Sequence, residues 1–110
     1  MRKEYNQVRQ VNERALAIYE KAMGAFSPHI VQPATNLALL HEIQGEYAQA
    51  RDLYQRALDL LEMNFGPDQT DTVSILVLYA RLLYRMGLTR EAKRLEARAF
   101  AMQDRLLKET

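Results

Sequence analysis

The sequence predicts an all-α protein, a solenoid of antiparallel helical hairpins with about five helices. The chain repeats itself at an interval of 42 residues, so that Ala15, Ala57 and Ala99 open the similar stretches ALAIYEKAMG, ALDLLEMNFG and AFAMQDRLLK. A period of this length is typical of helical-hairpin arrays. The four glycines and three prolines cluster between apolar stretches, which favours long helices joined by brief turns. Apolar residues in those stretches recur three and four positions apart, as on one face of a helix.

The first expected helix covers residues 3–23. Its apolar stripe has helical spacing and consists of Val8, Val11, Ala15, Ile18 and Ala22. Gly24 fits the end of this helix, because glycine accepts the left-handed conformation that commonly closes one. Ser27 and Pro28 can cap and open the next helix.

The second expected helix runs to about Gln44 and carries Pro33 among its first residues. Because proline lacks an amide donor, either the regular helix begins near Gln32 or Pro33 bends it. Gly45 then makes a tight turn, and a third helix begins at Tyr47 and ends before Gly66. These two helices form an antiparallel hairpin.

The fourth expected helix covers residues 72–86, with a cap at Thr70 or Asp71. It is apolar on nearly every side, so other helices must cover it from two directions. A fifth helix follows Gly87 and is charged on one face. Small residues mark the places where antiparallel helices approach closely, namely Ala38, Ala50, Ala80 and Ala92.

Composition narrows the class of protein. The chain has 110 residues, 48% of them hydrophobic and 26% charged, which suits one domain with a buried core. It has no cysteine, which excludes a disulfide framework and thiol chemistry. The charged N-terminal stretch lacks the apolar segment of a secretory signal, and no apolar run approaches the length of a membrane span. We therefore expect a cytoplasmic protein with no membrane association.

The stretches NLALLHEIQGEYAQARDLYQRALDLLEMNFGPD and LYARLLYRMGLTREAKRLEARAF closely resemble tetratricopeptide repeats. The 42-residue spacing and the GPD turn at residues 66–68 are similar to those of kinesin light chains. The resemblance implies a right-handed α-solenoid forming a single domain over residues 1–110. Residues 3–24 then correspond to the second helix of a partial repeat, and residues 28–66 and 70–108 to complete repeats. The chain is expected to be a piece of a longer array.

Three positions depart from the pattern of the family. Glu96 stands where Tyr54 stands one repeat earlier, and Asn12 holds the corresponding place before that. An ionised carboxylate is costly to bury, so we expect Glu96 to be exposed and the fifth helix to be a terminal cap. His41 replaces the aromatic residue that usually ends the NLALLY run.

In tetratricopeptide arrays the first helix of each hairpin lines a concave groove that holds peptides. The resemblance places two sets of residues there, with Thr35, Asn36, Leu39, Ile43, Val77, Arg81, Tyr84 and Arg85 as the expected peptide contacts and Gln32, Glu42, Ser74 and Leu78 beside them. Asn36 matches an asparagine that holds peptide backbone through its amide. Arg81 and Arg85, one helical turn apart, are suited to acidic side chains or a carboxylate.

Structural alternatives apply to the same residues. Asn36 can instead bond a neighbouring helix, and Arg81 and Arg85 can be solvated surface. The apolar members of the groove can be covered by further helices, and core is favoured over groove for Leu78. Tyr84 can be either a ligand contact or a residue of the core.

The remaining polar features point away from chemistry. Arg90, Arg94, Arg98 and Arg105 form a basic stripe on the last helix, but interspersed acidic residues favour a solvated face over nucleic-acid binding. His29 and His41 do not share a helical turn, and neither of them joins a carboxylate cluster. No metal or other cofactor is therefore expected. Asp68 and Asp71 lie in a turn, where capping explains them better than acid–base catalysis.

The sequence thus predicts a non-catalytic module that binds a protein or a peptide segment with acidic and apolar residues in a concave groove. The alternative is a scaffold whose exposed helical ends stack on further repeats or on another copy of the chain.

Overall fold

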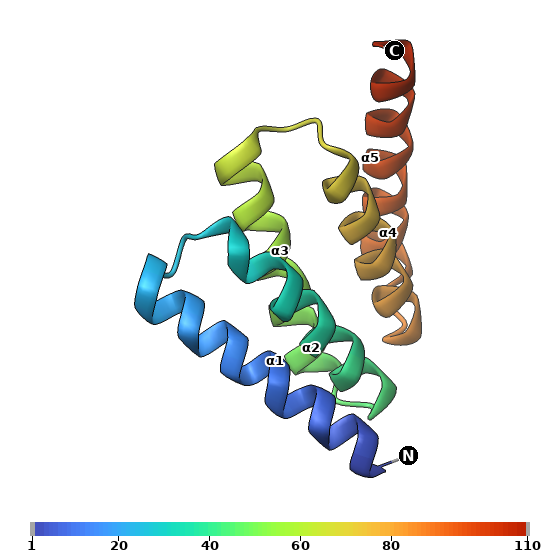
Figure 1. The fold of residues 1–110 in the computed structure, drawn as a ribbon. Coiled ribbons are helices and arrows are strands. Elements are labelled where there is room, and N and C mark those ends of the chain that lie inside the picture. The colour runs from blue at the N-terminus through green and yellow to red at the C-terminus, as the bar shows by residue number, and fades with distance from the viewer. Residues whose placement is uncertain (1, 110) are drawn as a thin grey trace.

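The computed structural model describes residues 2–109, and within that range helices joined by short turns make up the chain, with no strand. Five α-helices follow one another across the molecule, each antiparallel to the next (Figure 1). The helices are α1 (Arg2–Met23), α2 (Val31–Ile43), α3 (Tyr47–Phe65), α4 (Thr70–Arg85) and α5 (Thr89–Lys108). This arrangement confirms the predicted all-α helical-repeat fold.

The connections repeat in step with the sequence. Gly45 and Gly87 both have a φ of 78°, a left-handed backbone that suits glycine. The next amides, of Glu46 and Leu88, donate to the carbonyls five residues earlier at 2.8 and 2.9 Å. The two hairpins therefore turn through the same backbone hydrogen bonds.

Pro33 lies in the first turn of α2, because the helix begins at Val31. A single 3₁₀ turn, η1 (Pro28–Ile30), precedes it, and the Ser27 hydroxyl accepts a hydrogen bond from the His29 amide at 3.2 Å. The alternative that α2 begins near Gln32 is therefore the one observed, since proline at this position removes no intrahelical hydrogen bond.

The prediction of a side-chain cap on α4 is wrong. The helix begins at Thr70, and its N-cap residue, Gln69, makes no side-chain cap hydrogen bond. Asp68 pairs with Arg105 of α5, at 2.8 and 3.1 Å. A bidentate pair to a guanidinium draws this carboxylate away from the helix end.

The main core lies between α2, α3, α4 and α5. The apolar helix α4 packs against both α3 and α5, as its composition requires. The four small residues predicted at close approaches are all at most 1% exposed, and the rings of Tyr54 and Tyr79 stack beside them at 6.1 Å. Helix α1 packs on α2 and η1 through a smaller cluster around Ile30.

Candidate functional site

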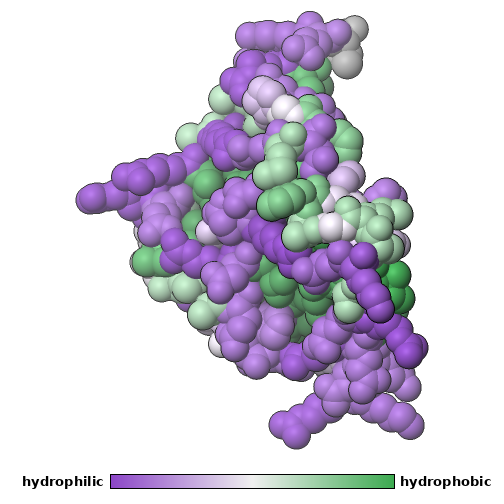
Figure 2. Space-filling model, turned by 90° about the vertical axis from the view of Figure 1, so that its left-hand side faces the viewer, coloured by the Kyte–Doolittle hydropathy of each residue, from purple (hydrophilic) through white to green (hydrophobic). Residues whose placement is uncertain are grey.

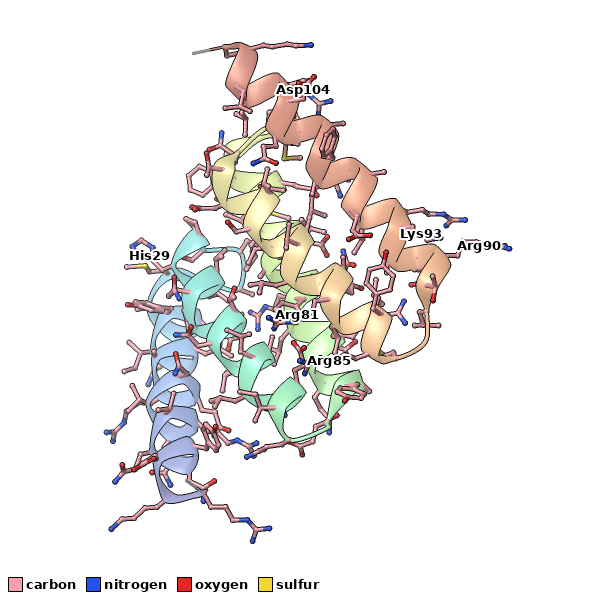
Figure 3. All side chains as sticks on the ribbon, turned by 90° about the vertical axis from the view of Figure 1, so that its right-hand side faces the viewer. His29, Arg81, Arg85, Arg90, Lys93 and Asp104 are labelled. Atoms are coloured by element: carbon pink, nitrogen blue, oxygen red, sulfur yellow. The ribbon has the colours of Figure 1, made fainter. Side chains whose placement is uncertain are left out.

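Helices α2 and α4 are joined by Glu42, a carboxylate that is only 2% exposed. Its two oxygens accept hydrogen bonds from Arg81, from Nε at 3.2 Å and from Nη2 at 3.1 Å. The Tyr54 hydroxyl donates to the same carboxylate at 3.1 Å, and Arg85 forms an ion pair with it at 3.2 Å. Figure 3 shows both arginines between α4 and α2. A buried charge of this kind is stable only when its partners surround it.

The cluster carries a net positive charge, since two guanidiniums share one carboxylate. The hydrogen bonds to Glu42 hold the pKa of Arg81 above its ordinary value. Burial, followed by the neighbouring Glu42 charge, raises the pKa of the Tyr54 phenol. The side chains of Arg81 and Arg85 remain 46% and 50% exposed, so an external anion can still reach them.

Apolar and aromatic side chains surround this cluster. Ile43 and Val77 are 56% and 53% exposed, and Tyr84 is 39% exposed. Leu39 and Leu78 are half-buried, and Leu78 packs against the main core. The exposed side chains therefore come from the expected peptide contacts on α2 and α4.

Two expected contacts are used within the protein. Thr35 is buried, and its hydroxyl donates to the Val31 carbonyl at 2.7 Å. The Asn36 amide donates to the Asn12 side chain of α1 at 3.0 Å and accepts from Gln32 at 3.1 Å. The geometry thus matches the structural alternative for Asn36, in which it bonds a neighbouring helix.

Tyr84 is a surface residue whose hydroxyl donates to Glu96 of α5. That hydrogen bond raises the pKa of the phenol, because the ionised form could not donate. Glu96 is exposed, as its charge predicts.

The burial of Glu42 was missed by sequence reasoning, which placed it on the groove surface. No local signal marks it, since its partners lie 12, 39 and 43 residues away. The acid stands one turn before Gly45, and only the packing of α4 on α2 brings the arginines to it.

The basic stripe of α5 is partly engaged in ion pairs. Arg98 pairs with Glu62 of α3, and Arg105 pairs with Asp68. In Figure 3, Arg90 and Lys93 point away from the other helices. Arg90, Arg94 and Arg105 are exposed, as a solvated face predicts, and Arg98 is half-buried.

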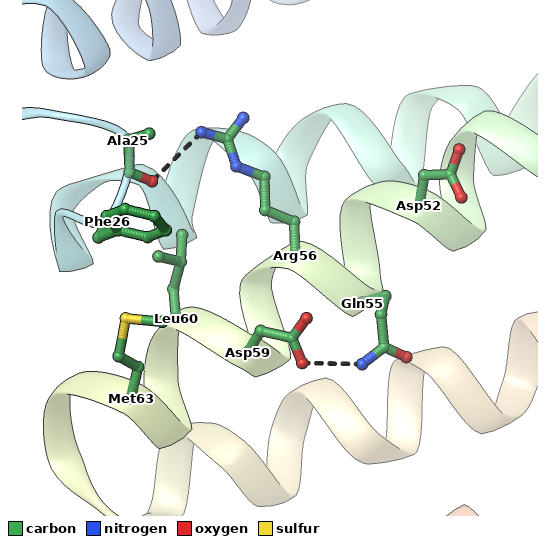
Figure 4. Close-up of a pocket in the computed structure, with 8 residues that line it drawn as sticks. All are labelled: Ala25, Phe26, Asp52, Gln55, Arg56, Asp59, Leu60 and Met63. Carbon is green, nitrogen blue, oxygen red and sulfur yellow. Dashed lines mark hydrogen bonds between the residues drawn. The ribbon is translucent and has the colours of Figure 1, made fainter.

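A separate hollow of about 410 Å³ lies beside α3 and the loop that follows α1 (Figure 4). Its lining combines the exposed side chains of Phe26 and Met63 with two carboxylates, of Asp52 and Asp59. Arg56 crosses it toward the Ala25 carbonyl, at 3.5 Å. The sequence pattern did not single out this hollow.

Clusters of metal-ligating side chains and membrane-spanning helices are both absent from residues 2–109. In that range there is no group of three or more histidine, aspartate and glutamate side chains placed to hold a metal ion. None of the helices described there has both the length and the apolar character needed to cross a membrane.

The chain is similar to a known family of repeats and to a eukaryotic protein sequence. The profile of a family described as Tetratricopeptide repeat matches residues 1–63 and 29–105. A clustered mitochondria protein homolog of the yeast Meyerozyma guilliermondii is 25% identical over 97 residues, which is 88% of this chain. The match spans only 8% of that relative's length.

Proposed function

Because the chain belongs to the tetratricopeptide repeat family, whose repeats generally mediate protein–protein interactions, we propose that it binds a peptide segment on the face formed by α2 and α4. The observation that carries this proposal is the net positive cluster of Glu42, Arg81 and Arg85. Its two arginines are held in place by a buried acid yet remain half exposed. Prior ordering of this kind lowers the entropy lost on binding.

The surroundings of the cluster favour a segment with both acidic and apolar residues. A peptide carboxylate would take the exposed side of the two guanidiniums, while apolar side chains would cover Ile43, Val77 and Tyr84. Asn36 would contribute its second amide hydrogen to the peptide backbone, since only one is used by Asn12. A non-catalytic role and a cytoplasmic location belong to this proposal, as does the kinesin-light-chain-like subclass.

A panel of fluorescent peptides with acidic and apolar residues tests the groove by anisotropy. For a peptide that binds, the Arg81→Ala/Arg85→Ala double variant is expected to weaken affinity about tenfold or more, the range of one or two charge-assisted contacts. The double variant Arg90→Ala/Arg94→Ala removes the same charge from α5 and should leave affinity unchanged.

Removing both arginines also strips Glu42 of its two cationic partners and leaves only the Tyr54 hydroxyl, so a second variant separates binding from folding. Val77→Ser alters an exposed apolar residue and leaves both arginines in place, so it should weaken peptide binding without lowering the melting temperature. Unchanged affinity in both groove variants would exclude this face as the peptide site.

The second candidate function is assembly through exposed helical ends. It is favoured by the apolar side chains that α1 leaves in solvent, among them Val8, Val11 and Ile18. Sedimentation across a range of protein concentrations tests whether the chain assembles with itself.

A further inference from the structure

An unpartnered apolar stripe runs along the outer side of α1. It consists of Val8, Val11, Ala15, Ile18 and Ala22, and its three larger side chains are 45%, 66% and 56% exposed. Helix α1 contacts α2 through a different side, on which Asn12, Leu16 and Tyr19 lie. The side of the molecule that carries α1 shows hydrophobic areas between hydrophilic ones (Figure 2).

The 42-residue period identifies what belongs on this stripe. The same register positions are buried or half-buried in α5, where they are Ala92, Leu95, Ala99, Met102 and Leu106. Helix α5 packs against α4, the first helix of its own hairpin. We call α2 and α4, the first helices of the two hairpins, inner helices, and we call α1, α3 and α5 outer helices. In α3 the corresponding positions begin with Ala50, Leu53, Ala57 and Leu60, and they are covered in the same way. The stripe on α1 is therefore an uncovered docking surface, called the seat below, that fits an inner helix similar to α2 or α4.

A charge pattern of the same period extends to the edge of the seat. Arg56 of α3 pairs with Glu20 of α1 at 3.1 Å, and Arg98 of α5 pairs with Glu62 of α3. These ion pairs join successive outer helices at equivalent positions. The next member of the series toward the N-terminus is Arg14, which makes no ion pair with any residue in the range 2–109. Arg14 is therefore placed beside the seat to pair with a carboxylate of a further outer helix.

A second copy of the chain does not match this seat. Its far end exposes an outer helix, α5, with Glu96, Phe100 and Gln103 at the positions that Tyr54, Leu58 and Leu61 occupy in α3. Stacking that end on α1 would supply no inner helix and would set a carboxylate near an apolar surface. Pairing two α1 helices about a two-fold axis at Ala15 would bring both copies of Arg14 together.

We propose that α1 docks the end of a helical hairpin array, an outer helix followed by an inner one, that lies outside residues 1–110. An amphipathic inner helix of that array lies antiparallel on the stripe, and the outer helix before it presents a carboxylate to Arg14. The seat is distinct from the α2–α4 face. The assembly function proposed above is thereby assigned to one end of the molecule and to one class of partner.

The chain itself contains a probe of the required design. Residues 47–85 comprise α3 and α4, the outer and inner helices that cover α5, and they include the Glu62 that pairs with Arg98. A synthetic peptide of this sequence is titrated into the full chain by calorimetry. Binding is expected, and Val11→Asp should weaken it at least about tenfold because a carboxylate would then face the apolar inner helix.

The charge contact is tested by a double-mutant cycle. Arg14→Ala in the chain and Glu62→Gln in the peptide should each weaken binding several-fold, and the two together should cost no more than one alone. Arg14→Lys should retain much of the affinity. Arg81→Ala should change nothing, which separates this seat from the groove.

Two outcomes overturn the proposal. One is the absence of binding, or binding that Val11→Asp leaves unchanged. The other is a dimer of the full chain that Val11→Asp dissociates, because a second copy would then occupy the seat.

Discussion

Glu42 is the residue on which the contact between α2 and α4 depends. It lies at the end of α2, in the main core, and its oxygens have partners on α3 and α4. A hydrogen bond to a charged, buried group contributes more than one at the surface. The half-exposed arginines are screened by water, so most of the stabilisation comes from satisfying a carboxylate that cannot be solvated.

We predict that Glu42→Gln lowers the free energy of unfolding by about 1–3 kcal/mol, because the amide replaces an acceptor with a donor that faces two guanidiniums. Urea denaturation followed by circular dichroism measures the change. The matched control is Glu13→Gln on the exposed surface of α1, which should stay within about 0.5 kcal/mol of the wild type. Equal stability of the two variants would mean that Glu42 is not held as described.

At the scale of the elements, ion pairs position the outer helices and the connections between hairpins. The loop before α4 is tied to α5 by Asp68 and Arg105. One repeat earlier the same two positions hold Phe26 and Met63, which line the hollow beside α3. The same connection is thus charged in one repeat and apolar in the other.

The Asp68–Arg105 pair predicts an acid-dependent part of the stability. Hydrogen bonding to Arg105 holds the pKa of Asp68 below its ordinary value of 3.8. A lowered folded-state pKa stabilises the fold above the unfolded value, and this contribution disappears as pH falls through the folded-state pKa. Asp68→Asn should therefore be less stable than the wild type at neutral pH, with a difference that closes below about pH 4.

Urea midpoints measured from neutral to acid pH check this prediction. Asp52→Asn, on the exposed surface of α3, is the control and should follow the wild-type profile. A constant difference in stability between Asp68→Asn and wild type across the whole pH range would show that the ion pair does not cause the pH dependence.

At the scale of the whole molecule, the two ends of the array differ in character. The first outer helix leaves an apolar stripe in solvent. The last one exposes a surface on which Phe100 stands between the polar side chains of Glu96 and Gln103. We therefore expect contacts with further helices at the α1 end.

Equivalent positions at the two ends should respond differently to truncation. Ile18 and Met102 occupy the same register of the repeat but are 56% and 1% exposed. We predict that Met102→Ala lowers the free energy of unfolding by about 2–4 kcal/mol, because it leaves a cavity between α4 and α5. Ile18→Ala should change the free energy of unfolding by less than about 0.5 kcal/mol, because most of this side chain is in solvent and its loss leaves no cavity between helices.

Chemical denaturation of both variants gives the comparison directly. If Ile18→Ala were as damaging as Met102→Ala, the stripe on α1 would already be covered in solution, and the seat would not be vacant.

The helices and their turns could be predicted from the sequence because they depend on local interactions. The spacing of apolar residues places each helix within a few positions, and the glycines that close the turns adopt positive φ wherever the period puts them. The predicted start of α4 is two residues late, because Thr70 and Asp71, which resemble capping residues, lie inside the helix and Gln69 is its N-cap.

The sequence by itself determined the all-α repeat, its 42-residue period and the approximate place of each helix, because these follow from periodicity and turn chemistry within one hairpin. Only the tertiary structure decided the environment of individual polar side chains. Glu42 is buried, Asn36 is bonded to α1 and Arg98 is paired with α3, through contacts that join residues 24 to 39 positions apart. Burial and pairing depend on which neighbouring helix is present, and that is a property of the assembled molecule.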